Sequence, residues 1–166
     1  MQVKFRIATI ADLREINCLV QDAIAAMKKE QIDQWDERYP DQEILREDIE
    51  KQQLYVGYVE NKIVVIYVIN QEFDQEYNTG KWEYNEKPFY VLHRLCVDPK
   101  QQKQGIARST MRHIEEELKA KGIGAMRLDV FSKNPSALRL YHSFGFKKVG
   151  HADWRKGRFY LMEKCI

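Results

Sequence analysis

The stretch from Val91 to Arg108 reads V-L-H-R-L-C-V-D-P-K-Q-Q-K-Q-G-I-A-R. Its first part, 91–97, is rich in apolar and β-branched residues, which predicts a strand. Asp98-Pro99 ends that strand, because proline has no N–H to donate to a central ladder. Good helix formers with apolar residues at helical spacing follow, so we expect a helix over 104–121. A strand, a short loop and a helix N-terminus in this order are typical of an anion-binding connection.

The loop over 102–108 has the chemistry of a phosphate site. The first N–H groups of a helix lack intrahelical partners, and the helix dipole places positive potential there. Gly105 and Ala107 carry little or no side chain, so a diphosphate could approach the backbone closely, and Lys103 and Arg108 add positive charge. Taken alone, the pattern is more often an ordinary strand–helix connection with a basic loop, because short motifs recur by chance.

Length and composition predict one globular domain over residues 1–166, with 44% hydrophobic and 31% charged residues. The 27 basic and 25 acidic residues give a net charge of +2, which is too balanced to indicate nucleic acid or an anionic membrane as a partner. The beginning of the sequence lacks the apolar core of a signal peptide, and no apolar run is long enough to span a membrane. Three widely spaced cysteines suit reduced thiols, so we expect a soluble, cytoplasmic protein.

The spacing of apolar residues predicts a mixed α/β chain. Strands are expected over 2–8, 54–58, 63–69, 89–97, 126–131, 146–150 and 158–164. Helices are expected over 12–29, 42–51 and 104–121, and from an Asn134 cap to Gly145. The segments 71–88 and 151–157 are expected to be connections, and the first is long enough to be functional or mobile.

Three separated pieces of sequence carry a family resemblance. The first is Leu95-Cys96-Val97-Asp98-Pro99 leading into Gln102-x-x-Gly105-x-Ala107. The second is Leu128-Asp129-Val130, with Asn134 just beyond it. The third is Asn134-x-x-Ala137-Leu138-x-Leu140-Tyr141-x-x-Phe144-Gly145-Phe146. In this order and spacing they resemble the GNAT superfamily of acyl-CoA-dependent N-acetyltransferases, and the order of elements extends the resemblance over essentially the whole chain.

The resemblance implies a single α/β GNAT-like domain, with a mixed, mostly antiparallel, splayed sheet of about seven strands flanked by about four helices. The sheet would splay between the strand ending at Val97 and the strand carrying Asp129. The backbone of Leu95, Cys96 and Val97 would bind the pantetheine arm of acetyl-CoA like an added strand. The pyrophosphate would bind the loop residues Gln102, Lys103, Gln104, Gly105, Ile106 and Ala107, with Arg108 nearby, and Asn134 would bond to the CoA arm.

The chemistry implied by the resemblance is direct attack of an amine on the thioester carbonyl of acetyl-CoA. The N–H of Val97 would stabilise the oxyanion. Tyr141 matches the family tyrosine that protonates the leaving CoA thiolate, and a phenol of pKa about 10 keeps its proton at neutral pH. The alternative for Tyr141 is a helix aromatic that only packs in the core.

Two side chains compete for the role of general base, which is needed because an alkylamine of pKa ~10 is mostly protonated at neutral pH. Asp129 matches a carboxylate position of some family members, but it could instead be a structural partner of a cation such as Arg94 or Arg127. His93 has the ordinary pKa for proton uptake, but a lone strand histidine is more often a hydrogen-bonded structural residue. The sequence leaves both possibilities open.

Aromatic residues in three segments suggest a substrate-binding surface, namely Trp35, Tyr39, Trp82 and Trp154. They could equally be loop anchors packed on the core. No metal-ligating pattern occurs, so no metal is expected. The predicted acceptor is a primary amine of a small molecule or peptide. The alternatives are a non-catalytic acyl-CoA-binding sensor and a protein N-terminal or lysine acetyltransferase. An exposed edge among the last strands could pair with a second copy to form a homodimer.

Overall fold

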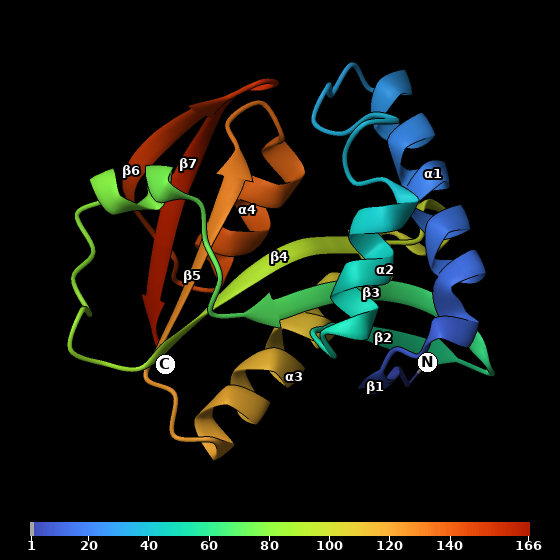
Figure 1. Cartoon of the computed structure of the whole chain (residues 1–166), viewed down its shortest axis with the longest axis horizontal. Coiled ribbons are helices and arrows are strands. Elements are labelled where there is room, and N and C mark those ends of the chain that lie inside the picture. The colour runs from blue at the N-terminus through green and yellow to red at the C-terminus, as the bar shows by residue number, and fades with distance from the viewer. Residues whose placement is uncertain (1) are drawn as a thin grey trace. The chain divides into compact units, whose positions relative to one another are not determined.

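The computed structural model describes residues 2–166 and contains seven strands in that range (Figure 1). They are β1 (Lys4–Ile7), β2 (Leu54–Val59), β3 (Lys62–Asn70), β4 (Phe89–Val97), β5 (Ala125–Phe131), β6 (Lys147–Trp154) and β7 (Gly157–Cys165). The α-helices are α1 (Leu13–Lys29), α2 (Gln42–Glu50), α3 (Ile106–Ala120) and α4 (Pro135–Ser143). Short 3₁₀ helices are η1 (Ile10–Asp12), η2 (Gln75–Thr79) and η3 (Pro99–Gln101).

The strands follow the order β1-β2-β3-β4-β5-β7-β6 in the sheet. Neighbours are antiparallel at β1–β2, β2–β3, β5–β7 and β6–β7, and parallel at β4–β5. The parallel register runs only from Phe89↔Ala125 to Leu92↔Leu128, whereas β5 continues its pairing with β7 as far as Phe131↔Phe159. The predicted α/β fold, with a mixed and mostly antiparallel sheet, is therefore confirmed.

The chain divides into two compact units, so one domain over residues 1–166 stays a prediction. Unit 1 contains the chain up to Ile69 together with Arg94–Thr110, and unit 2 contains Asn70–His93 together with Met111–Ile166. Both β4 and α3 therefore begin in one unit and end in the other. No helix in the described range, 2–166, is long and apolar enough to cross a membrane.

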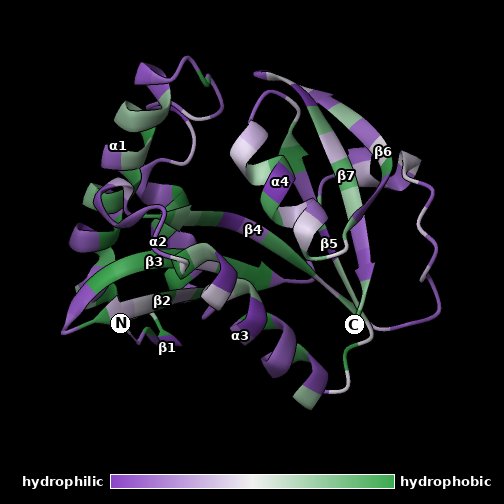
Figure 2. Cartoon of the chain, turned by 180° about the vertical axis from the view of Figure 1, so that it is seen from behind, coloured by the Kyte–Doolittle hydropathy of each residue, from purple (hydrophilic) through white to green (hydrophobic). Residues whose placement is uncertain are grey.

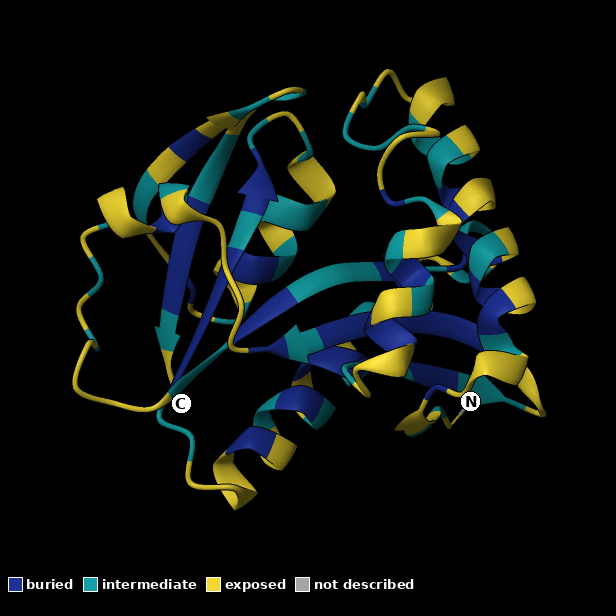
Figure 3. Cartoon of the chain, viewed as in Figure 1, coloured by how far each residue is buried: buried dark blue, intermediate teal, exposed yellow. Residues whose placement is uncertain are grey.

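The core of unit 1 lies between the two N-terminal helices and the first strands. The inner face of α1 is formed by residues at helical spacing, and Figure 3 shows the helix buried on one side and exposed on the other. The buried set is Leu13, Ile16, Leu19, Val20 and Ala23. Helix α2 adds Leu45 and Ile49 to the same cluster. Hydrophobic residues run along β3 (Figure 2), and the consecutive residues 63–68 are all buried, so this strand is covered on both faces.

The core of unit 2 is built around β5, which is buried at every residue except the half-buried Asp129. Arg127 lies directly opposite Glu163 on β7, and its Nε is 3.2 Å from Glu163 Oε2. The guanidinium of Arg127 also lies 3.8 Å from the ring centroid of Phe89 and 4.4 Å from that of Trp82. This buried cation is therefore compensated by a carboxylate and by two aromatic faces.

The last two strands are longer than the sequence predicted, and the expected connection over 151–157 is wrong. Strand β6 continues to Trp154 and β7 begins at Gly157, so most of that segment is a hairpin. Asp153 faces Arg158 across it with a 3.0 Å ion pair, and Trp154 packs edge-on against Phe159. The charged residues of this segment suggested a loop. Cross-strand pairs of this kind, however, stabilise strand pairing even where the residues are polar.

Candidate active site

The second half of β4 in unit 1 alternates between two environments. Leu95 and Val97 are half-buried and pack on the cluster that contains Ile106, whereas Cys96 is buried in the cluster formed by α1, α2, β2 and β3. Arg94 lies within this strand but has a φ of 49°, in the left-handed region that residues in β-strands avoid. Burial raises the pKa of the Cys96 thiol to about 12, so this thiol stays protonated at neutral pH.

The loop that follows β4 is exposed between firmly anchored ends. On its N-terminal side the Asp98 carboxylate accepts the backbone N–H of Lys100 at 3.0 Å, and the Asp98 N–H donates to the carbonyl of Val64 at 2.8 Å. On its C-terminal side Ile106 is buried and begins α3. Residues 102–105 between these anchors are all exposed.

The conformation of this loop fits the predicted pyrophosphate site. Lys103 and Gly105 have φ values of 64° and 79°, and an added Cβ at Gly105 would meet nothing within 4 Å. Glycine is therefore favoured here by its φ rather than by crowding. The first N–H groups of a helix lack intrahelical partners and can bind an anion, and pyrophosphate binding by this loop stays a prediction.

Asn134 caps α4 in unit 2, as the sequence predicted. Its Oδ1 accepts the backbone N–H of Ala137 at 3.2 Å, and Pro135 begins the helix. The second predicted role of Asn134, bonding to the CoA arm, stays a prediction.

Asp129 has a tyrosine partner, and the two arginines considered from the sequence have carboxylate partners of their own. The hydroxyl of Tyr77 donates to Asp129 Oδ2 at 2.6 Å. Arg127 is paired with Glu163 and with Asn85 Oδ1 at 3.1 Å, while Arg94 is paired with Asp48 in unit 1. The carboxylate of Asp129 thus accepts a charge-assisted hydrogen bond from a phenol.

Tyr141 is a buried phenol whose pKa depends on burial and on the charge of Asp129. It lies on α4, is 8% exposed, and its ring packs edge-on against Phe146 at 5.8 Å between centroids. Burial raises the pKa of Tyr141 well above its ordinary value, and the negative charge of Asp129 raises it further. Both of these effects favour the protonated phenol, as a general acid requires, while the contact with Phe146 fits the packing role as well.

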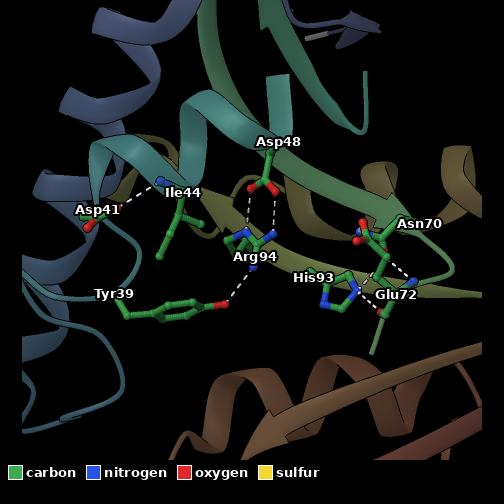
Figure 4. Close-up of polar contacts among 8 residues, drawn as sticks. All are labelled: Tyr39, Asp41, Ile44, Asp48, Asn70, Glu72, His93 and Arg94. Carbon is green, nitrogen blue, oxygen red and sulfur yellow. Dashed lines mark hydrogen bonds and ion pairs between the residues drawn. The ribbon is translucent and has the colours of Figure 1, made fainter. Parts of the chain in front are cut away.

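His93 is anchored in unit 2 by two oxygen atoms (Figure 4). Its Nε2 lies 2.8 Å from Asn70 Oδ1 and 3.0 Å from the carbonyl oxygen of Glu72. Asn70 Oδ1 also accepts the N–H of Glu72 at 2.9 Å, which assigns this atom as the oxygen of the amide. Both neighbours of Nε2 are acceptors, so Nε2 carries the hydrogen, and the basic atom of the neutral ring is Nδ1. These contacts favour the structural interpretation of His93.

Arg94 forms a separate polar network in unit 1 (Figure 4). Its Nε and Nη2 donate to the two carboxylate oxygens of Asp48 at 2.8 Å and 2.7 Å, and its Nη1 donates to the hydroxyl of Tyr39 at 2.7 Å. The network joins β4 to α2 and to the segment before Pro40. Arg94 is thereby a structural anchor for Tyr39, one of the predicted substrate-binding residues.

The predicted aromatic substrate residues all have structural contacts. In unit 2, Trp82 stacks on Tyr77 and donates its Nε1–H to the Tyr77 carbonyl at 2.7 Å, and Trp154 donates to Glu76 Oε2 at 3.1 Å. In unit 1, Trp35 packs against the core and Tyr39 is partly exposed. Unit 2 also holds an open cavity of about 530 Å³ along β6, whose lining includes Glu76. Substrate binding by these four residues stays a prediction.

Sequence reasoning missed Tyr77 and Asp48 as partners of the candidate residues. Tyr77 lies 52 residues before Asp129, and Asp48 lies 46 residues before Arg94, so no local spacing links them. Each of the two residues had one weak signal in the sequence. Tyr77 lies in the aromatic-rich segment 71–88, and Asp48 is a carboxylate on the inner face of the predicted helix over 42–51. Within residues 2–166 the structure has no group of three or more His, Cys, Asp or Glu side chains that could hold a metal ion.

Comparison with known proteins relates the chain to acetyltransferases. A 59-residue segment is 37% identical to ribosomal protein bS18-alanine N-acetyltransferase of Escherichia coli K12, and covers 36% of this chain and 40% of that protein. A 64-residue segment is 42% identical to N-alpha-acetyltransferase RimI of Mycobacterium tuberculosis, and covers 38% of this chain and 39% of that protein. The matched segments thus span well under half the length of these curated relatives.

The similarity extends over 97% of the chain in a solved structure and over residues 20–146 in a family model. A putative acetyltransferase from Staphylococcus aureus Mu50 superposes with a TM-score of 0.77 and 30% identity, over 97% of each chain. The model of the Acetyltransferase (GNAT) family matches residues 20–146. These residues include β4, the loop 102–108, Asp129, Asn134 and Tyr141. The chain belongs to the GNAT acetyltransferase family.

Proposed function

We propose that the protein transfers the acetyl group of acetyl-CoA to a primary amine. The observation that carries the proposal is the presence in unit 2 of the Asp129 carboxylate on β5 and the buried Tyr141 phenol on α4, whose pKa is raised by burial and by the charge of Asp129. A protein that only binds acyl-CoA has no use for a base beside an acid. Membership of the GNAT family and the exposed loop at the start of α3 support acetyl-CoA as the donor.

The proposed reaction needs two proton transfers, and these residues can provide them. Asp129 accepts a proton from the amine nitrogen as that nitrogen forms its bond to the carbonyl carbon of the thioester. Tyr141 donates its phenolic proton to the sulfur as the carbon–sulfur bond breaks, and the proton on Asp129 restores the phenol through solvent. The products are the N-acetylated amine and free CoA thiol. The N–H of Val97 is the proposed donor to the oxyanion.

The coupling between the two groups gives the transfers an order. While Asp129 is charged, it opposes ionisation of Tyr141 and raises the pKa of the phenol. Uptake of the amine proton neutralises Asp129 and removes that opposition. Tyr141 therefore becomes a stronger acid after the amine has attacked, which is the stage at which the CoA sulfur needs a proton.

Each unit, taken by itself, carries residues that we propose to bind acetyl-CoA. In unit 1, the backbone of Leu95–Val97 is the proposed binding group for the pantetheine arm. The loop 102–107, exposed over 102–105, is the proposed binding group for the pyrophosphate, with Arg108 adding charge. In unit 2, Asn134 is proposed to bond to the CoA arm in addition to capping α4. Acetyl-CoA supplies the activated acyl group when it is bound.

A second candidate acceptor is the α-amine of a protein N-terminus. The names of the E. coli and M. tuberculosis relatives favour it, because both describe N-terminal or alanine N-acetyltransferases. We therefore propose two acceptor classes for the same chemistry, a small alkylamine and a peptide that begins with alanine.

A product assay distinguishes these acceptors. The protein and acetyl-CoA are incubated with an alanine-initiated peptide, with the same peptide carrying a blocked N-terminus and one lysine, and with small alkylamines, and the acetylated products are identified by mass spectrometry. Acetylation of the free-N-terminus peptide alone would support the protein-directed candidate. Acetylation of only the small amines would support the small-molecule candidate, and absence of any acetylated product would overturn the proposal.

The buried thiol of Cys96 should not carry the acetyl group, because its pKa of about 12 leaves almost no thiolate at neutral pH. We expect Cys96→Ala to keep kcat within about twofold, and to lower the free energy of unfolding by about 1 kcal/mol through lost packing. Steady-state kinetics and urea unfolding measure the two effects. A loss of kcat of about 10²-fold or more, with an acetylated Cys96 detected in the unsubstituted protein, would contradict direct attack.

The pH dependence of kcat should show no basic limb from Tyr141. Its pKa is raised above the ordinary value of 10, and a raised pKa means that the phenol keeps its proton to higher pH. We therefore expect kcat not to fall between about pH 7 and about pH 10, while kcat/KM for the amine rises as more of the free amine becomes neutral. A basic limb below about pH 9 that is abolished in Tyr141→Phe would contradict this prediction.

A further inference from the structure

Tyr77 is the most firmly held side chain next to the proposed base. It lies in η2 of unit 2, is 3% exposed, and its ring is stacked between Phe73 and Trp82 at centroid distances of 5.7 Å and 5.5 Å. Its backbone is fixed as well, because its carbonyl accepts the Trp82 Nε1–H at 2.7 Å and the Gly80 N–H at 3.1 Å. The phenol oxygen therefore has little freedom to move.

The hydroxyl of Tyr77 makes a short, charge-assisted contact. It donates to Asp129 Oδ2 at 2.6 Å, within the range expected for an O–H donor and a carboxylate. Asp129 projects from the middle of β5 between Leu128 and Val130, both of which are buried. A carboxylate in such surroundings needs a donor to fix its rotation and to stabilise its negative charge.

We infer that Tyr77 is a positioning residue that acts through Asp129 in acetyl transfer. The inference rests on the proposed function, because it assigns a role within that reaction. By donating to Oδ2, Tyr77 fixes the carboxylate plane and directs proton uptake to the remaining lone pairs of Asp129. The phenol keeps its own proton throughout the reaction, so no additional acid or base is needed.

The loss of this one hydroxyl should leave the loop around Tyr77 in place. The N–H of Lys81 donates to the carbonyl of Val149 at 2.9 Å, and the N–H of Glu83 donates to Glu163 Oε1 at 2.7 Å. Trp82 is held by its stack on Tyr77 and by the guanidinium of Arg127, and neither contact uses the hydroxyl. Tyr77→Phe therefore removes the donor to Asp129 while it retains the ring and the anchors of the loop.

The test is a double-mutant cycle on the full chain with Tyr77→Phe and Asp129→Asn. We expect Tyr77→Phe to lower kcat by about 10- to 100-fold, the usual cost of removing a partner that orients a functional group. The KM values for acetyl-CoA and for the amine should stay unchanged. In the Asp129→Asn background the second substitution should cause no further loss of kcat, because Tyr77 acts through Asp129. The matched control is Tyr55→Phe in unit 1, whose ring stacks on Tyr67, and it should leave kcat unchanged.

A spectroscopic readout accompanies the kinetics. A buried hydroxyl proton in a short bond to a carboxylate should give a downfield proton NMR resonance, which disappears in Tyr77→Phe and shifts upfield in Asp129→Asn. Unchanged kcat in Tyr77→Phe, or additive losses in the double variant, would overturn the inference while leaving the proposed function intact. If the unsubstituted protein showed this resonance but acetylated no amine, the proposed function would fail and the positioning role would fail with it.

Discussion

Replacing Tyr141 by phenylalanine is expected to lower kcat by about 10²- to 10⁴-fold, the usual contribution of a general acid. Without the phenolic proton the CoA sulfur must leave as a thiolate, which raises the barrier for breakdown of the intermediate. The KM for acetyl-CoA should change little, because the proton is needed only as the carbon–sulfur bond breaks. Release of free CoA thiol under saturating amine measures the effect.

The substitution is conservative enough to separate catalysis from packing. Phenylalanine keeps the ring that packs edge-on against Phe146, so thermal unfolding of the variant should resemble that of the unsubstituted protein. A variant that is equally stable and equally active would show that Tyr141 only packs in the core. If Tyr141→Phe lost activity only in proportion to its loss of stability, the result would not support a general-acid role for Tyr141.

The largest effect on stability is expected for Arg94→Met. Arg94 and Asp48 are only 13% and 8% exposed at their side chains, and the guanidinium makes two hydrogen bonds to the carboxylate. Removing the cation leaves a buried carboxylate without compensation, which costs about 3–5 kcal/mol in comparable buried pairs. Urea unfolding of the two proteins measures the difference in the free energy of unfolding.

Two further variants test whether burial of the ion pair causes the large loss of stability in Arg94→Met. The pair formed by Arg6 and Asp12 has similar geometry, with contacts of 2.7 Å and 3.0 Å, but the Arg6 side chain is 43% exposed. Arg6→Met should therefore cost no more than about 1 kcal/mol. Replacing both buried partners, as in Arg94→Met/Asp48→Leu, should recover much of the loss because no unpaired charge remains. Equal costs for Arg94→Met and Arg6→Met would contradict this account.

The sequence predicted the features that depend on neighbouring residues. Asn134 caps α4 as predicted, and the second helix begins at the predicted residue 42, where Asp41 caps it by accepting the N–H of Ile44 at 2.9 Å. The exposed, glycine-bearing loop after β4 was predicted from its spacing alone. These signals are local, because caps and tight loops are satisfied within a few residues.

The contacts that shape the candidate site depend on tertiary structure. The partner of Asp129 is a tyrosine that lies in a polar and aromatic segment expected to be a long loop. The extension of β6 to Trp154 required the pairing of Asp153 with Arg158 and of Trp154 with Phe159, which only the register of the hairpin reveals. Hydrophobic periodicity carries no information on which polar side chains will meet across a fold.

The most direct test of the account is the release of CoA thiol from acetyl-CoA, measured with and without an amine acceptor. The account predicts no release with acetyl-CoA alone, and release in equal amounts with the acetylated amine when an acceptor is present. If acetyl-CoA binds by calorimetry but no amine in the panel causes release, the protein is a sensor of acyl-CoA and the proposed function is wrong. Release without any amine, accompanied by an acetylated protein side chain, would instead contradict direct attack.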